Sequence, residues 1–262
     1  MKENYRRRRE EQKPVEEVEG QLEGRNALTE ALKSGRTIDK VFVATGEIDR
    51  GLQRRAAQAK DAGAVIVPVD RRKLDAMSTT HAHQGVIALA AAREYYSIDD
   101  ILQEAADRGE APLLVICDEL SDPHNLGAIL RSAECAGAHG VIIPKRRSVG
   151  LTAVVAKASA GAVEYMKVAR VTNINTAIEE LKEKGVWIFG TAAEGSIPMY
   201  KADLRIPAAI VIGSEGDGMS RLTRQKCDVT VHIPMKGRIT SLNASAAASI
   251  LLYEAVRQRL EG

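Results

Sequence analysis

Residues 113–131 read LLVICDELSDPHNLGAILR and hold the parts of one strand–turn–helix unit. The run Leu113–Cys117 is continuously apolar, which is typical of a strand buried on both faces of a parallel sheet. Asp122-Pro123 starts a turn, and apolar residues at helical spacing follow over Leu126–Ala136. The stretch therefore predicts a buried strand that leads through a polar turn into a helix.

The same alternation continues towards the end of the chain. Further strands are predicted at Val141–Pro144, Val186–Gly190, Ala208–Gly213 and Val229–Ile233. Helices are predicted at Leu151–Ala158, Ile174–Lys184, Ser220–Lys226 and Ala244–Arg259. Short apolar runs between helices favour an α/β domain with a parallel sheet. Ligands of such sheets bind at the carboxyl ends of the strands, so the residues after the strands are the functional candidates.

A smaller α/β unit is predicted before it. Its strands are expected at Val41–Ala44, Val65–Val69 and Val86–Ala90, and its helices at Asn26–Lys33, Leu52–Ala62 and Arg71–Met77. We divide the chain into a charged tail at 1–20, a small domain at 21–92, a linker at 93–111 that includes a helix at Ile98–Asp107, and a second domain at 112–262. The tail is expected to be disordered, or to act as a basic arm on phosphates.

Composition excludes several classes of protein. The 262 residues are 45% hydrophobic and 27% charged, as in a soluble globular protein. No apolar run reaches the roughly 18 residues of a membrane helix, and the first twenty residues lack a secretory signal. The three cysteines form no metal-ligand spacing with the five histidines. We therefore expect a cytoplasmic protein with reduced thiols and no metal. A net charge of +2 permits an RNA partner without requiring one.

The turn after Leu113–Cys117 carries the first candidate site residues, Asn125 and Arg131. They are six positions apart in the sequence, so they would lie about 120° apart around a helix. An arginine there could hold a phosphate or carboxylate through two parallel hydrogen bonds. Alternatively, Asn125 could cap the helix and Arg131 could form a surface salt bridge.

Two more polar segments follow predicted strands. Residues 212–219 read IGSEGDGM, a glycine-rich loop that matches neither GxxxxGK[ST] nor GxGxxG. Glu215 would repel a phosphate, so the loop fits a neutral or cationic ligand, or is a plain strand–helix turn. Residues 233–245 read IPMKGRITSLNAS and lead into an alanine-rich helix. Ser241 and Asn243 are residue types that cap helices, which could by itself explain them.

Cations follow the strand Val141–Pro144. Lys145, Arg146 and Arg147 are adjacent and would attract a phosphate backbone, or form a solvated loop. His83 of the first unit is a weaker candidate for the same role.

Taken together, the three polar segments resemble the SpoU class of RNA ribose 2′-O-methyltransferases, in the SPOUT superfamily. The matching residues are Asp122–Gly127 with Arg131, Ile212–Gly216 with Gly218, and Ile233–Met235 with Gly237 and Ser241–Ser245. Each motif alone is weak, but their common order makes the set specific. The first unit looks like the small ribosomal-protein-like substrate-binding domain of this class. Ala244 departs from many relatives, which carry valine there, and changes only packing volume.

The resemblance implies a homodimer and a deep trefoil knot, which general topology rules would exclude. It also implies S-adenosylmethionine as the cofactor and no metal. Carried over by position, the cofactor contacts are Gly213, Ile233 and Leu242, with Gly190 and Thr191 nearby. The residues carried over to the reaction itself are Arg131, Asn125, Glu215, Ser241 and Asn243.

The implied reaction is methyl transfer to a ribose 2′-hydroxyl. A guanidinium is a poor proton acceptor, so we expect Arg131 to hold an RNA phosphate and polarise the hydroxyl. The proton would go to the phosphate or to Glu215. Within this class, the chain resembles enzymes that methylate a guanosine of 23S rRNA, so this substrate is expected. The RNA would be held by the first unit and by Lys145–Arg147. Alternatives are a tRNA 2′-O-methyltransferase of the same fold and a non-catalytic RNA- or ribosome-binding protein. The missing GxGxxG disfavours a dinucleotide-binding enzyme.

Overall fold

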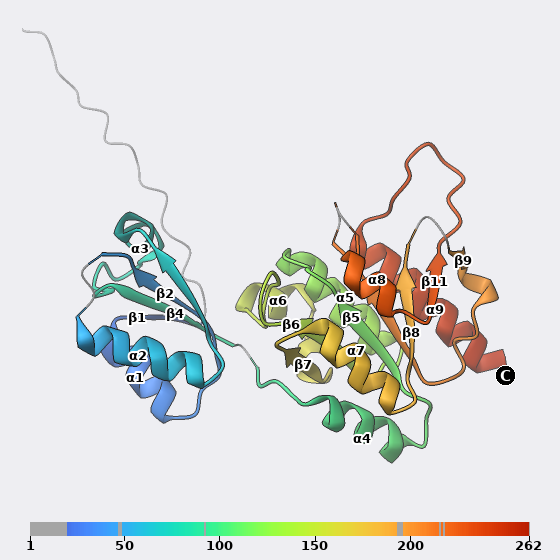
Figure 1. Ribbon diagram of the computed structural model, residues 1–262, viewed down its shortest axis with the longest axis horizontal. Coiled ribbons are helices and arrows are strands. Elements are labelled where there is room, and N and C mark those ends of the chain that lie inside the picture. Colours follow the sequence, from blue (N-terminus) through green and yellow to red (C-terminus); the bar gives the residue numbers. More distant parts are fainter. Residues whose placement is uncertain are drawn as a thin grey trace, which may run out of the picture.

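The computed structural model describes residues 20–46, 49–91, 93–192, 196–214, 216 and 218–261. Within them, the chain forms a smaller N-terminal unit and a larger C-terminal unit, each built on its own sheet (Figure 1). The expected tail, apart from Gly20, and the candidate Glu215 lie outside the described residues.

The N-terminal unit is a four-stranded sheet in the order β1-β4-β2-β3. Its strands are β1 (Gln21–Glu23), β2 (Ile38–Ala44), β3 (Val65–Val69) and β4 (Val86–Ala90), and its helices are α1 (Arg25–Lys33), α2 (Arg50–Asp61) and α3 (Arg71–Met77). Strand β4 runs antiparallel to β1 and β2, whereas β2 and β3 are parallel. Leu28 of α1 and Leu52 of α2 belong to one core cluster, and Leu74 of α3 belongs to another. The sheet thus buries apolar residues on both faces.

The C-terminal unit is a seven-stranded sheet in the order β7-β6-β5-β10-β8-β11-β9, and every described pairing in it is parallel. The predicted parallel α/β sheet is therefore confirmed. Its strands are β5 (Leu113–Cys117), β6 (Gly140–Pro144), β7 (Val168–Val171), β8 (Trp187–Thr191), β9 (Ile197–Pro198), β10 (Ala208–Ile212) and β11 (Val229–His232). All residues of β5, β6 and β10 are buried, which explains their uninterrupted apolar sequences.

Helices cover both faces of this sheet. They are α4 (Ile98–Arg108), α5 (Pro123–Cys135), α6 (Ala153–Ala158), α7 (Ile174–Glu183), α8 (Arg221–Lys226) and α9 (Ala244–Glu261). Alternate residues of β5 separate the two cores: Val115 packs in the cluster of α5, α6 and α9, and Ile116 packs in that of α4 and α7. Gly127 lets α5 approach α6 closely, because a Cβ there would lie 2.5 Å from the Cβ of Ala158.

The expected linker 93–111 needs a correction. Its helix α4 is not a free connection, because Ile98 and Ile101 are buried in the core of the C-terminal sheet. The helix therefore belongs structurally to the C-terminal unit. Strands β1 and β9 were not predicted because they have only three and two residues, and β7 was not predicted because the charged Arg170 interrupts its apolar run. The trefoil knot stays a prediction. Among the described residues, no helix has both the length and the apolar character that crossing a bilayer requires.

Candidate functional site

The carboxyl ends of three strands meet at one edge of the C-terminal sheet. Gly190 of β8 stands opposite Val211 of β10, and Thr191 stands opposite Val231 of β11. The residues that follow these strands therefore start side by side. Figure 1 shows the segment after β11 as a long loop beyond this edge.

A cavity of about 600 Å³ lies at this edge. It is lined by the ends of β8 and β11, by the segment 233–242 and by α9. Thr191, Ile233, Ser241 and Leu242, four of the predicted site residues, line it. No described lining residue is an aspartate, glutamate, lysine or arginine. The volume is within the range of small-molecule sites.

Apolar side chains stand open to solvent around the cavity. Ile239 is 73% exposed, and Met235 and Leu242 are also classed among the exposed large hydrophobic residues. Exposed apolar side chains that lie together are typical of a surface that binds a ligand or another macromolecule. The sequence analysis missed Met235 and Ile239 as lining residues. The signal that could have found them was the presence of four large apolar residues in the segment 233–242, of which only Ile233 and Leu242 were predicted as site residues.

Gly213 and Gly190 are placed by packing next to this edge. A Cβ on Gly213 would lie 2.1 Å from the carbonyl carbon of Gly218, because Ser214 and Gly218 exchange two backbone hydrogen bonds of 3.0 Å. A Cβ on Gly190 would lie 2.6 Å from Sγ of Cys227. Neither glycine is among the lining residues of the cavity. The structure thus shows why both positions need glycine.

Asn125 and Asn243 meet beside the cavity. Nδ2 of Asn243 donates a hydrogen bond of 2.9 Å to Oδ1 of Asn125, which is buried in the first turn of α5. Oδ1 of Asn243 accepts from the backbone amide of Ser245 at 3.0 Å, so Asn243 also caps α9. The cap of α5 is Asp122, whose carboxylate accepts from the amide of His124. The capping alternative is therefore correct for Asn243 and wrong for Asn125.

Arg131 lies on α5 and is exposed. Its neighbour Ser132 shares a hydrogen bond of 2.7 Å with Ser249 of α9, so Arg131 stands next to the contact between these helices. Within the part of the chain that the structure describes, its side chain forms no ion pair, so the salt-bridge alternative finds no support there. The exposed guanidinium is available to an anionic ligand.

Two family models cover almost all of the described chain. Residues 112–253 match the SpoU rRNA Methylase family. The chain belongs to this family. Residues 21–96 match the model described as RNA 2′-O ribose methyltransferase substrate binding. Both halves of an RNA ribose methyltransferase are therefore present, as the resemblance of the three motifs predicts.

Relatives and solved structures agree with this assignment. YacO of Bacillus subtilis, a putative TrmH family tRNA/rRNA methyltransferase, is 50% identical over 90% of this chain and 94% of its own length. The SpoU methyltransferase AviRb from Streptomyces viridochromogenes, crystallised with AdoMet, has a TM-score of 0.60 at 25% identity, covering 92% of this chain and 91% of its own. An AdoMet-bound rRNA methyltransferase from Sinorhizobium meliloti has a TM-score of 0.58 at 26% identity, covering 90% and 86%.

The predicted RNA contacts of this family member divide into two groups. Lys145 and Arg146 have no ion pair within the described part of the chain, and both line a cleft next to the N-terminal unit. Arg147 instead pairs with Glu119, with Nη1 2.9 Å from Oε1, and this hydrogen bond raises the pKa of its guanidinium. His83 is buried: its Nδ1 accepts from the amide of Gly85. The prediction of His83 as an RNA contact is therefore corrected, because the ring is used to hold a turn.

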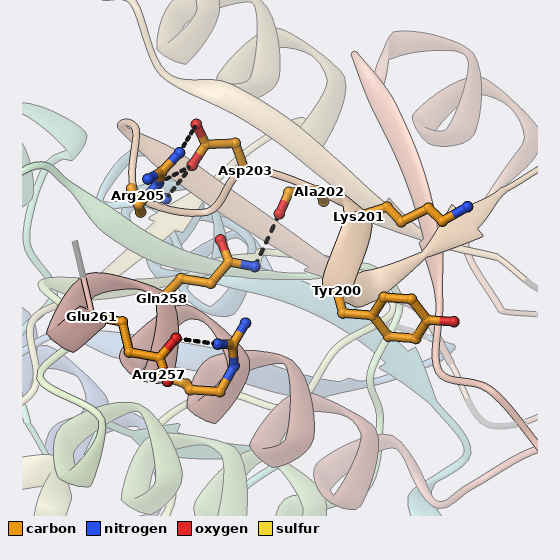
Figure 2. Close-up of a pocket in the computed structure, with 8 residues that line it drawn as sticks. All are labelled: Tyr200, Lys201, Ala202, Asp203, Arg205, Arg257, Gln258 and Glu261. Carbon is orange, nitrogen blue, oxygen red and sulfur yellow. Dashed lines mark hydrogen bonds and ion pairs between the residues drawn. The ribbon is translucent and has the colours of Figure 1, made fainter.

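A second hollow, of about 380 Å³, lies near the carboxyl end of α9 (Figure 2). Most of its charged groups are already paired: Arg205 binds Asp203, and Arg257 binds Glu254 and Glu261. Figure 2 shows the side chain of Lys201 extending away from these pairs. None of the predicted site residues lines this hollow, so it is not part of the candidate site.

Two of the three cysteines, Cys117 and Cys227, are poor candidates for thiol chemistry. Burial raises the pKa of Cys117 to about 12 and that of Cys227 to about 11. A thiolate is the reactive form of cysteine, and at neutral pH neither residue forms it to a useful extent. Among the described residues, no group of three histidine, cysteine or acidic side chains is placed to hold a metal ion.

Proposed function

We propose that the chain transfers a methyl group from S-adenosylmethionine to a ribose 2′-hydroxyl of RNA, specifically a guanosine of 23S rRNA. The observation that carries the proposal is the position of residues 241–243. Ser241 and Leu242 line the cavity, and the next residue, Asn243, bonds to Asn125 of α5. One short segment thus joins the cavity to the first turn of α5, the helix that carries Arg131.

The cavity residues fit the proposed cofactor. Ile233, Leu242 and Leu251 offer apolar contacts for an adenine, and backbone groups of the segment 233–242 offer hydrogen bonds. The cofactor has no phosphate, so a wall without lysine or arginine suits it. When bound, S-adenosylmethionine supplies a methyl group already activated on a sulfonium.

The chain's own residues then have to position the RNA. Arg131, on the exposed surface of α5, donates to a phosphate of the RNA and polarises the ribose hydroxyl. The pair Asn125 and Asn243 keeps α5 and the start of α9 in fixed relation, so that the hydroxyl meets the methyl group in line. The RNA phosphate or Glu215 accepts the proton.

Substrate choice and assembly are further parts of the proposal. The substrate-binding unit favours an rRNA, and a homodimer is expected from the family. A tRNA substrate is the second candidate, because the names of relatives such as YacO include both tRNA and rRNA.

Single-turnover methyl transfer to rRNA tests the site. Arg131→Ala should reduce the rate by about a hundredfold, a typical loss for one positioned donor, and Arg131→Lys should restore part of it. Calorimetry should show unchanged cofactor binding in both variants. Transfer at the wild-type rate in Arg131→Ala would refute the role of this residue. Mapping ribose methylation in cellular RNA with and without the protein then identifies the nucleotide.

A further inference from the structure

A cleft of about 550 Å³ lies between the two units. The N-terminal unit contributes residues of α2 and β3, and the C-terminal unit contributes the residues directly after β6 and β7. The charged residues that line the cleft are Lys60, Lys145 and Arg146, and no described lining residue is acidic. Such a wall is positive across both units.

These three cations are not used for internal ion pairs within the described part of the chain. The contrast with Arg147 is informative, since this next residue pairs with Glu119. Lys145 extends across the cleft, because its Nζ lies 3.5 Å from the position of a Cβ on Gly63. Unpaired cations that converge from two units are arranged for a ligand with several negative charges.

Buried contacts join the two units beside the cleft. Asp39 of β2 and Arg170 of β7 form an ion pair of 2.6 Å, and their side chains are only 3% and 5% exposed. The hydroxyl of Tyr95 donates to Asp39 at 2.7 Å and accepts from the amide of Leu151 at 2.8 Å. Arg170 precedes the lining residue Thr172 by two positions, so the pair joins the two units close to the wall of the cleft.

The cleft and the candidate cofactor cavity lie at the same edge of the C-terminal sheet. Lys145 follows β6, and the cavity lies at the ends of β8 and β11. The sheet order places β5 and β10 between β6 and β8, so three strand spacings, about 14 Å, separate the two sites across the sheet. A few nucleotides of an extended strand can cover this separation.

We propose that the interdomain cleft binds the phosphate backbone of the RNA substrate beside the methylated nucleotide, through Lys60, Lys145 and Arg146. The inference rests on the proposed function, because the RNA strand enters the cavity with its target ribose. Phosphate contacts set the register of a nucleic acid without reading its bases. The cleft therefore positions the strand, and sequence recognition is left to other contacts.

Salt-dependent binding of a single-stranded poly(U) oligonucleotide to the full chain tests the proposal. Each phosphate contact contributes about 0.7 to the slope of log affinity against log salt for single strands. The triple variant Lys60→Ala/Lys145→Ala/Arg146→Ala should lower this slope by about 2 and weaken binding at least tenfold. Arg205→Ala is the matched control, since this exposed cation pairs with Asp203 outside the cleft, and should keep the wild-type slope.

Activity separates this inference from the proposed function. The triple variant should raise KM for rRNA while cofactor binding and kcat at saturating RNA stay within about twofold of wild type. A triple variant with the wild-type slope and KM overturns the cleft assignment, even if methyl transfer is observed. Loss of slope in a protein that transfers no methyl group to any RNA supports the cleft and contradicts the proposed function.

Discussion

The side-chain amide of Asn243 donates a hydrogen bond of 2.9 Å to the side-chain oxygen of Asn125, 118 positions earlier in the chain. It joins the start of α9 to the start of α5, and the bond between Ser132 and Ser249 continues the contact along both helices. Two parts of the candidate site that lie far apart in sequence are therefore held by side chains that belong to the site itself.

Asn243→Asp tests this link. An aspartate can still accept from the amides of Ser245 and Ala246, so the cap of α9 is kept, but it has no amide to donate to Asn125. We expect near wild-type thermal stability and a ten- to hundredfold lower rate of methyl transfer, typical of misplaced reacting groups. Asn243→Ala, which loses the cap as well, should also be less stable by about 1 kcal/mol. An Asn243→Asp enzyme with full activity would show that the bond is not needed.

Much of the fold follows from apolar patterning. The strands β3, β4 and β5 and the helix α3 begin and end at the predicted residues. Strand β7 was missed because it has only four residues and includes a charged one, Arg170. The side chain of Arg170 can be buried because it pairs with Asp39, 131 positions away. No local sequence pattern reveals such a partner. The packing of α4 on the C-terminal sheet was not predicted because its apolar face is short.

The candidate site was predicted less completely than the fold. The motifs pointed to Asn125 and Asn243 separately, but their contact depends on tertiary packing between α5 and α9. His83 shows the opposite failure, because a polar residue in a turn was interpreted as exposed although it is buried against Asp75. The cleft beside Lys145 required both units in place, so Lys60 had no sequence signal of its own.

The buried ion pair between Asp39 and Arg170 joins the two units, so the effects of these two residues on the free energy of unfolding should be strongly coupled. Asp39→Asn removes one charge and leaves the guanidinium of Arg170 without its ion-pair partner, which typically costs about 3–5 kcal/mol. Oδ2 of Asp39 and Nε of Arg170 lack hydrogen-bond partners in the described structure, so the pair is incompletely satisfied. The double variant Asp39→Leu/Arg170→Met should therefore recover much of the loss. Urea unfolding of Asp39→Leu, of Arg170→Met and of the double variant measures the coupling, and additive effects would contradict it.

The hydrogen bonds to Glu23 predict that the N-terminal unit loses folding stability at acidic pH. Burial by itself would raise the pKa of this carboxyl group, but hydrogen bonds from Ser78, Thr80, the amide of Thr79 and Gln21 outweigh it and hold the pKa well below its ordinary value. A carboxyl group whose pKa is lower in the folded state stabilises the fold. This contribution is complete when the pH is above the pKa of the unfolded state, near 4.5, and it is lost as the pH falls below that value.

Urea midpoints between pH 6 and pH 3 measure this effect. Wild type should lose stability steadily below about pH 5, and Glu23→Gln should be less stable at pH 6 but change less with acidification. Glu30→Gln, at an exposed carboxylate on α1, is the control and should follow the wild-type curve. Parallel curves for Glu23→Gln and wild type would show that the hydrogen bonds to Glu23 have no net effect.

The hydrogen bonds of Arg259 indicate that the carboxyl end of α9 contributes to the stability of the fold and not to catalysis. Its guanidinium donates to the carbonyl oxygens of Ala111, Pro112, Leu204 and Ile206 at 2.6–3.1 Å. These residues precede β5 and β10, so they lie at the amino edge of the sheet, away from the cavity. Arg259→Ala should therefore reduce the free energy of unfolding by about 2–4 kcal/mol, as expected for several charged hydrogen bonds.

Arg259→Lys separates charge from geometry. A lysine keeps the charge but lacks the planar fork that reaches several carbonyls at once, so it should recover less than half of the lost stability. Both variants should keep the wild-type kcat well below their melting temperatures, because the contacts of Asn125 and Asn243 lie at the other end of α9. A lower kcat in folded Arg259→Ala would mean that the anchor also positions the site.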